Sequence, residues 1–237
     1  MTRRFFCADL GPETREVSLS GTEGRHLAVV LRAEPGDVVK LFNGRGGEAE
    51  GRVRSVTPQG VVLEISGHHQ SAGDTRRRVT LATAVPKGDR FDWLVEKATE
   101  LGVCRLVPLI TSRSVVEPRD TRLEKLRRVI VEASKQCRRN DLLELAPLTP
   151  WKQFLSGSFP SGSLWIAHPG GADCHEVCPA WPLEVTLLVG PEGGWTDQEI
   201  IEVQRTGGTA VSLGPLLLRV ETAGLALAAV ACAPVRH

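Results

Sequence analysis

The sequence of 237 residues lacks several features that define whole classes of protein. It has no run of about 20 apolar residues, the length that a helix needs to cross a bilayer. Its longest apolar stretch, residues 225–235, is rich in alanine and predicts a buried helix. The N-terminus carries Arg3 and Arg4 but no apolar segment long enough for a signal peptide. We therefore expect a cytoplasmic protein with no membrane partner.

A paired zinc-ligand pattern is also missing. Cys174 and Cys178 flank His175 and Glu176, but no second ligand pair at similar spacing follows. A reducing compartment keeps such cysteines as thiols. The sequence predicts no metal and ordinary thiols in a loop.

Two nucleotide-binding fingerprints are absent as well. No GxGxxG pattern follows residues 79–84, an apolar run that predicts a strand, and no glycine-lysine-serine/threonine triplet exists. These absences count against hydride transfer and nucleoside triphosphate hydrolysis. A nucleotide-binding oxidoreductase is therefore a distant alternative.

Charge is nearly balanced overall, at +1, which argues against a general polyanion binder. It is nevertheless concentrated locally. Between Arg119 and Arg139 there are eight basic and three acidic residues, and residues 76–78 form a second basic group. These segments are either solvated surface or a stripe that contacts phosphates.

The chain predicts two domains, a small β-rich one at 1–72 and a larger one at 73–237, because residues 67–74 are polar and unpatterned. In the first, we expect a helix at 24–31 and strands at 38–42, 48–56 and 61–65. In the second, we expect strands at 79–84, 106–110, 164–167, 185–189 and 209–213 and helices at 90–101, 123–137, 197–206 and 221–232. Gly102 is expected to end the helix at 90–101, and Thr196 with Glu199 is expected to form a capping box at the start of the helix at 197–206. The alternation of strands and helices predicts an α/β fold with a parallel sheet.

Three loops in the last third of the chain follow predicted strands, at 168–171, 190–195 and 214–222. Ligands of open parallel sheets bind at the carboxyl ends of the strands. Glycine there lets a ligand approach backbone amides, which suits a nucleotide or nucleoside. The three loops therefore predict a site for such a ligand.

Two of these loops carry motifs of a known family. Residues 188–196, LVGPEGGWT, resemble the LIGPEGGF-S/T motif of RsmE-type methyltransferases of the SPOUT superfamily, and residues 212–223, SLGPLLLRVETA, resemble their SLGPRILRTETA motif. Further matches lie at 26–32, 35–37, 86–90, 96–102, 113–116 and 132–136. Leu216, Val220 and Arg138 depart from the family pattern, which has arginine, threonine and glycine there. The resemblance covers nearly the whole chain.

The resemblance implies a SPOUT-type parallel α/β sheet with a C-terminal trefoil knot, preceded by a PUA-like β-barrel that binds RNA. It also implies a homodimer and S-adenosylmethionine (SAM) as the cofactor. The implied reaction is methylation of N3 of a uridine (uridine 1498 in the family) in 16S ribosomal RNA of the small subunit, giving 3-methyluridine.

The motifs and loops together give the expected site residues. We expect the cofactor to contact His168, Pro169, Leu188, Gly190, Pro191, Glu192, Gly193, Gly194, Leu213, Gly214, Leu218 and Thr222. We expect RNA contacts from Arg3, Arg4, Arg32, Arg113, Arg138 and Arg139.

The implied reaction needs a base or a cation, because uridine N3 carries a proton at neutral pH. Glu221 and Arg219 are the catalytic candidates because they flank the third loop. Glu221 could equally be a carboxylate favoured by the helix dipole, worth about 0.3–1 kcal/mol. Arg219 could be a tether for the knot, and Glu192 could serve only to anchor its loop.

Two other functions stay open. One is a SPOUT methyltransferase with another RNA target, although ribose-modifying relatives usually carry asparagine where this chain has Gly214. The other is a non-catalytic RNA-binding factor of ribosome assembly. Such a factor needs no cofactor pocket, so a cofactor-binding assay separates it from an enzyme.

Overall fold

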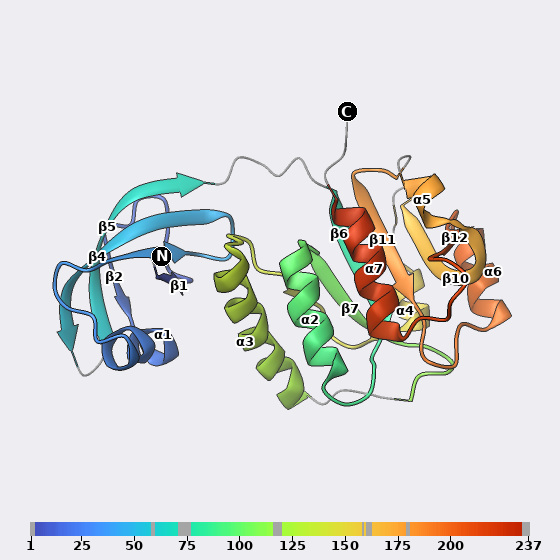
Figure 1. The fold of residues 1–237 in the computed structure, drawn as a ribbon, viewed down its shortest axis with the longest axis horizontal. Coiled ribbons are helices and arrows are strands. Elements are labelled where there is room, and N and C mark those ends of the chain that lie inside the picture. Colours follow the sequence, from blue (N-terminus) through green and yellow to red (C-terminus); the bar gives the residue numbers. More distant parts are fainter. Residues whose placement is uncertain are drawn as a thin grey trace. The chain divides into compact units, whose positions relative to one another are not determined.

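The computed structural model describes residues 3–57, 60–70, 77–115, 120–157, 159, 163–178 and 181–233. The chain divides into two compact units, each described here by itself (Figure 1). The β-rich unit contains Met1–Asp74 and Ser134–Leu142, and the α/β unit contains Thr75–Ala133 and Leu143–His237. A segment from the middle of the sequence therefore packs with the N-terminal unit.

The β-rich unit is built on one sheet. Its strands, in spatial order, are β1 (Arg4–Phe6), β3 (Val38–Phe42), β4 (Gly47–Thr57), β5 (Gly60–Gln70) and β2 (Glu16–Leu19). β1 and β3 are parallel, and the other neighbours are antiparallel. Alternating apolar side chains such as Val39, Leu41 and Leu63 form its core.

Parts of this unit differ from the sequence prediction. The expected helix at 24–31 is α1 (Gly21–Arg25), which continues into a π-helix, η1 (His26–Val30). Residues 67–70, which the sequence assigned to the unpatterned segment at the domain boundary, are instead the end of β5, where Gln70 pairs with Gly47. Backbone pairing extends the strand although the polar side chains there are exposed.

A parallel sheet forms the centre of the α/β unit. Its strands, in spatial order, are β12 (Thr209–Ser212), β10 (Leu164–Asp173), β11 (Glu184–Val189), β6 (Arg78–Ala84), β7 (Arg105–Ile110) and β8 (Glu144–Leu145), and β9 (Thr149–Pro150) also pairs with β7. Every one of these described pairs is parallel. From β6 the chain continues to β7 and β8 on one side of it. The later strands β10, β11 and β12 lie on the other side, with β11 next to β6, so the strand order reverses at β6.

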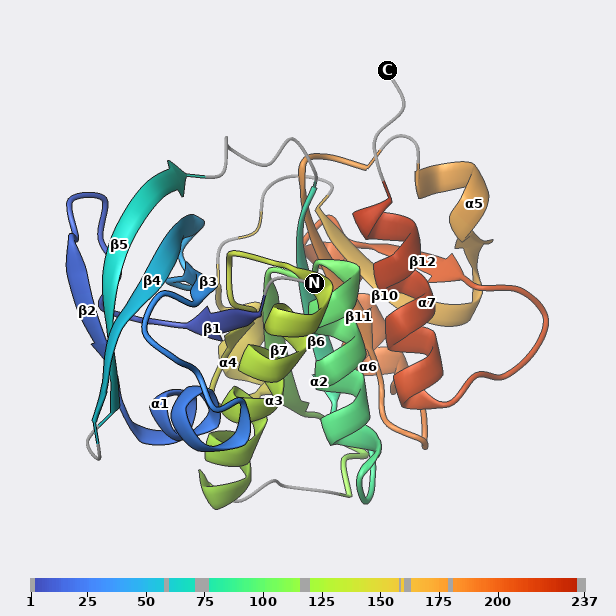
Figure 2. The same cartoon turned by 60° about the vertical axis from the view of Figure 1, so that its left-hand side comes forward.

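Helices cover both faces of this sheet. Figure 2 shows α2 (Arg90–Leu101) and α7 (Val220–Cys232) side by side in front of the strands, and Gly224 of α7 lies against Leu81 and Leu94. On the other face, α4 (Trp151–Leu155) and α6 (Asp197–Arg205) contribute Trp151 and Val203 to a core with Leu188. The remaining described helices are α3 (Asp120–Cys137) and α5 (Cys174–Val177).

The predicted α/β class with a parallel sheet is confirmed, and so are several local predictions. Gly102 ends α2 with φ of 97°, a left-handed conformation that favours glycine. Thr196 and Glu199 form the predicted reciprocal capping box. The trefoil knot stays a prediction. Within the described residues, no helix is long and apolar enough to cross a membrane.

Candidate functional site

A cavity of about 400 Å³ lies at the carboxyl ends of β11 and β12 and beside residues 167–169 of β10. All three loops that the sequence singled out contribute to its wall. The predicted cofactor residues that line it are His168, Pro169, Gly190, Pro191, Glu192, Gly194, Leu213, Gly214 and Leu218. Arg219, a catalytic candidate, also lines it. The structure therefore brings together loops that are distant in sequence.

Three predicted cofactor residues do not line the cavity. Leu188 is fully buried in β11, Gly193 packs against the side chain of Arg113, and Thr222 is exposed on α7. Sequence reasoning also missed several lining residues, namely Ala167, Val189, Trp195, Val211, Ser212, Leu216, Leu217, Val220 and Ala223. Most of these lie inside the two motifs or directly beside them, so membership of a motif was the usable signal.

The first predicted loop is a bulge inside β10 rather than a loop after it. Ala167 and Ala172 both pair with Val211, so residues 168–171 form the extra chain between them. Glycine is required there, because a Cβ on Gly171 would lie 2.4 Å from the Val211 nitrogen. The prediction that the strand ends at Ala167 was wrong, since proline and glycine in the sequence suggested a loop.

The second loop closes around an indole ring. A Cβ on Gly190 would lie 2.9 Å from the Trp195 ring, so only glycine fits above it. Trp195 is 8% exposed and packs against Trp151, with 5.1 Å between ring centroids. Its Nε1 is buried and has no acceptor among the described residues. The loop therefore places this indole donor, which is unpartnered among the described residues, beside the cavity.

The same loop is fixed from the neighbouring segment after β7. Arg113 donates to the carbonyls of Gly193 (2.7 Å) and Trp195 (3.3 Å). Glu199, only 2% exposed, accepts from the backbone nitrogens of Ser112 (2.9 Å) and Thr196 (2.8 Å). A satisfied buried carboxylate thus joins this segment to the start of α6. The expected RNA contact of Arg113 stays a prediction, and in this structure its guanidinium supports the glycine loop.

The third loop presents apolar side chains to solvent. Leu216 is 77% and Leu217 87% exposed, and Gly214 has φ of 111°, a conformation that favours glycine. Arg219 follows them and is exposed at the cavity wall. The loop therefore offers apolar surface and one cation next to the cavity.

Glu221 lies behind the cavity wall instead of on it. It is 5% exposed, and its Oε1 lies 3.5 Å from Arg90 Nη1. Its Oε2 is buried without a partner among the described residues. The helix-dipole and catalytic interpretations of this carboxylate both stay open.

In the β-rich unit, Arg4 is a buried structural group. Its Nη1 donates to the carbonyls of Ser134 (3.0 Å) and Arg139 (3.1 Å), and its guanidinium stacks over Phe42 at 4.2 Å from the ring centroid. Glu48 lies 3.5 Å from its Nη2, and burial lowers the pKa of Arg4. An RNA contact by Arg4, as predicted, would compete with these partners.

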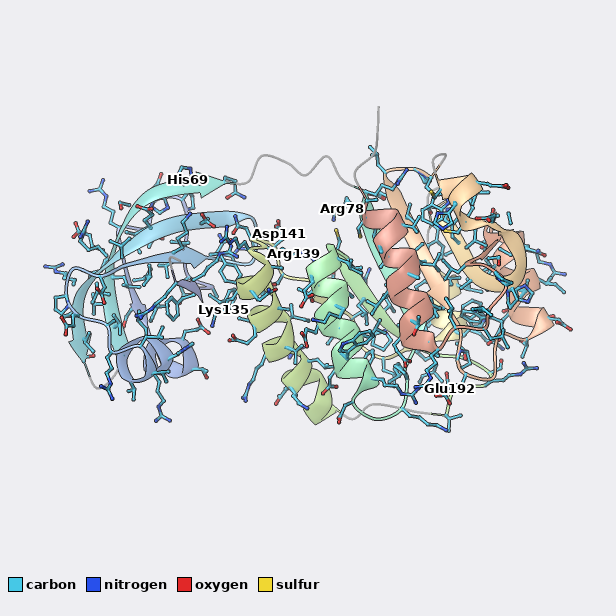
Figure 3. The ribbon with its side chains drawn as sticks, viewed as in Figure 1. His69, Arg78, Lys135, Arg139, Asp141 and Glu192 are labelled. Carbon is cyan, nitrogen blue, oxygen red and sulfur yellow. The ribbon has the colours of Figure 1, made fainter. Side chains whose placement is uncertain are left out.

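Other predicted RNA contacts in this unit are accessible. Arg3 and Arg32 are exposed and line a cavity of about 580 Å³. Arg32 (φ 49°) and Arg138 (φ 62°) hold left-handed backbone conformations that are uncommon for residues other than glycine. Arg139, labelled in Figure 3, is half-buried, and its backbone nitrogen donates to the Ser134 carbonyl. Strained residues often occur at functional positions, which makes Arg32 and Arg138 suitable for variants.

The cysteines show no metal-binding arrangement. No cluster of three or more potential ligands occurs within the part of the chain that the structure describes, and all six cysteines are free. Cys174 begins the short helix α5 where the sequence suggested a loop. Burial raises the pKa of its thiol to about 11, so it stays protonated at neutral pH.

Comparison with known proteins agrees with this architecture. A family model described as an RNA methyltransferase domain matches residues 74–232, and one described as an RNA methyltransferase PUA domain matches residues 19–66. The fold and the glycine-loop site thus define the class, an RNA methyltransferase.

Individual relatives narrow this class. The chain is 31% identical to ribosomal RNA small subunit methyltransferase E of Mycobacterium bovis, over 97% of this chain and 92% of that protein. A Legionella pneumophila methyltransferase, solved in complex with SAM, is 31% identical with a TM-score of 0.87, covering 97% and 96% of the two chains. Ribosomal RNA small subunit methyltransferase E of Neisseria gonorrhoeae, solved bound to S-adenosyl methionine, is 28% identical, with the same TM-score and coverage. The chain belongs to the family of ribosomal RNA small subunit methyltransferase E.

Proposed function

We propose that this protein transfers a methyl group from SAM to N3 of one uridine in 16S ribosomal RNA of the small subunit, producing 3-methyluridine. The observation that carries the proposal is the cavity formed by the bulge of β10 and the loops after β11 and β12 in a chain of this family. The reaction belongs in the cytoplasm, where ribosomal subunits are assembled.

The cofactor is SAM, and the residues of the cavity fit it. A volume of about 400 Å³ is in the range of small-molecule sites. Gly190 lies directly over the Trp195 ring, whose buried Nε1 has no acceptor among the described residues and is a donor beside the cavity. When bound, SAM supplies a methyl group on a sulfonium sulfur. The glycine loops position it, and positioning accounts for up to roughly 7–11 kcal/mol of barrier reduction in well-oriented reactions.

Arg219 and Glu221 are the proposed catalytic residues. Uridine N3 must lose its proton before it can form a bond to carbon. Arg219 is an exposed cation at the cavity wall, suited to stabilise the negative charge of the deprotonated uracil. Glu221, the second proposed catalytic residue, lies behind the cavity wall with a buried Oε2 that has no partner among the described residues.

RNA binding is proposed to involve the exposed arginines of the β-rich unit. Arg3, Arg32 and Arg138 are accessible to phosphates. Proteins reach single bases where RNA is unpaired, and N3 lies on the Watson–Crick edge, so the target uridine must be unpaired. We also propose a homodimer, in which the exposed Leu216 and Leu217 are apolar surface available for burial.

Methyl transfer tests the enzymatic part of this proposal. Purified protein, tritiated SAM and small subunits lacking the modification should give labelled 16S RNA. Arg219→Ala and Glu221→Gln should lower the single-turnover rate by about 10²-fold or more while cofactor affinity changes much less. Normal turnover in both variants would show that these catalytic assignments are wrong. RNA binding without any cofactor binding would instead support the non-catalytic assembly factor.

A further inference from the structure

Arg90, the first residue of α2, contacts three separate segments of the α/β unit. Its Nε donates to the Lys87 carbonyl (3.1 Å), its Nη2 donates to Glu192 Oε1 (3.0 Å), and its Nη1 lies 3.5 Å from Glu221 Oε1. Lys87 adds a looser ion pair, with 3.7 Å between its Nζ and Glu192 Oε2. One guanidinium therefore joins two carboxylates from different elements.

Both carboxylates belong to elements that form the cavity wall. Glu192, labelled in Figure 3, lies in loop 190–195 and lines the cavity. Glu221 lies in the first turn of α7, whose residues Val220 and Ala223 line it. Arg90 is not one of the lining residues. Any effect of Arg90 on a ligand in the cavity must therefore act through the two walls that it connects.

The exposure of these side chains indicates that their ion pairs contribute more to the orientation of Glu221 than to folding stability. The side chains of Arg90 and Glu192 are 32% and 44% exposed, and ion pairs so open to water contribute little to folding. The Glu221 side chain is only 7% exposed, so its orientation depends more strongly on the partner of its Oε1. A planar guanidinium holds two carboxylates in fixed directions, whereas an ammonium group acts as a point charge. The contribution expected of Arg90 is thus mainly geometric.

We propose that Arg90 is a positioning residue that fixes loop 190–195 against the start of α7 and so preforms the cofactor cavity. The inference rests on the proposed function, because it takes SAM as the ligand of that cavity. Binding to a preformed site avoids the free-energy cost of ordering a loop. Loss of Arg90 should therefore weaken cofactor binding, and it should also slow methyl transfer because Glu221 loses the partner that orients it.

Calorimetric titration with SAM measures cofactor affinity, and single-turnover methylation of small subunits measures the rate of methyl transfer. Arg90→Ala should bind SAM about tenfold more weakly, within the usual range of coupling between sites. It should also react more slowly than wild type at saturating SAM, because Glu221 loses the partner of its Oε1. Arg90→Lys should recover part of the affinity, since the charge remains but the planar fork is lost. If Arg90→Ala does not fold, Arg90→Lys and Glu192→Gln decide the outcome.

A matched control is Arg105→Ala, which removes an ion pair of 3.2 Å to Glu144 at the opposite end of the strands. It should leave SAM affinity within about twofold of wild type, because surface pairs contribute little. The double variant Arg90→Ala/Glu192→Gln should bind about as weakly as Arg90→Ala alone, since coupled residues are not additive.

Three results would overturn the inference: wild-type affinity in both Arg90 variants, an equal loss in Arg105→Ala, or a double variant whose loss is the product of the single losses. Absence of SAM binding by the wild-type protein would contradict the proposed function and the inference together. Wild-type affinity in the Arg90 variants would contradict the inference alone, so the two failures are distinguishable.

Discussion

In the α/β unit, loop 190–195 is held by side chains from several elements, whereas the β-rich unit leaves most of its candidate RNA-binding arginines exposed. Arg113 and Glu199 contact the loop and its helix cap, and Arg90 contacts Glu192. Arg3 and Arg32, by contrast, are open to solvent. Loss of the buried Glu199 carboxylate should therefore affect stability, whereas changes at the exposed arginines should affect RNA binding alone.

Glu199→Ala should have the largest effect, because it removes a buried carboxylate that satisfies the Ser112 and Thr196 backbone nitrogens. Leaving these donors unpaired should lower the free energy of unfolding by about 3 kcal/mol. Urea denaturation measures this change. Glu184→Ala, at a side chain 60% exposed, is the control and should change stability by less than about 0.5 kcal/mol. Equal losses of stability in both variants would contradict the structural role assigned to Glu199.

Arg4→Ala should have the second largest effect on stability. It tests a candidate RNA-binding arginine of the β-rich unit whose guanidinium is buried against other residues. The buried guanidinium serves the carbonyls of Ser134 and Arg139 and packs on Phe42, so its loss should cost about 2–3 kcal/mol of stability. Arg3→Ala, at an exposed neighbour, should cost less than about 0.5 kcal/mol. Thermal unfolding compares the stability lost in the two variants. An Arg4→Ala protein as stable as Arg3→Ala would contradict the structural role of Arg4.

Trp195→Phe should affect the ligand more than the fold. The Nε1 donor has no acceptor among the described residues, so its removal costs the free protein no hydrogen bond, and any loss of stability comes from the smaller ring against Trp151. If the donor serves SAM, affinity should fall about fivefold, the equivalent of one hydrogen bond of about 1 kcal/mol. Calorimetric titration gives the affinity. Unchanged affinity would mean that the indole contributes only packing.

Arg32→Gly should give the smallest change in stability. Glycine tolerates the left-handed backbone at φ of 49°, so the variant should be as stable as wild type or more stable by up to about 1 kcal/mol. Loss of one phosphate contact should lower the slope of log affinity against log salt by about one. Filter binding of 16S RNA fragments at several salt concentrations measures it. An unchanged slope would remove Arg32 from the proposed RNA contacts.

Local signals in the sequence predicted much of the α/β unit. The capping box at Thr196 and the left-handed Gly102 depend on neighbouring residues alone, and both were confirmed. The strands that carry the loops were also predicted, because continuous apolar runs are typical of a buried parallel sheet. The convergence of three glycine-containing segments on one cavity followed from the rule for parallel strands.

Features set by distant pairing were not predictable. β1 and β2 are only 3 and 4 residues long, too short for a periodic pattern. The bulge at 168–171 depends on where Val211 pairs, and the sequence near Pro169 suggested a loop. Glu221 was expected at the site, but its place behind the cavity wall follows from its pairing with Arg90. Side-chain partners across the fold decide such details.

The most direct test of the central claim is the identity of the methylated nucleoside. Small subunits lacking the modification are incubated with the protein and SAM, and the 16S RNA is digested and analysed by mass spectrometry against nucleoside standards. The account predicts 3-methyluridine at a single site, absent from reactions without the protein. A ribose-methylated nucleoside, or a methylated base other than uracil, would contradict it.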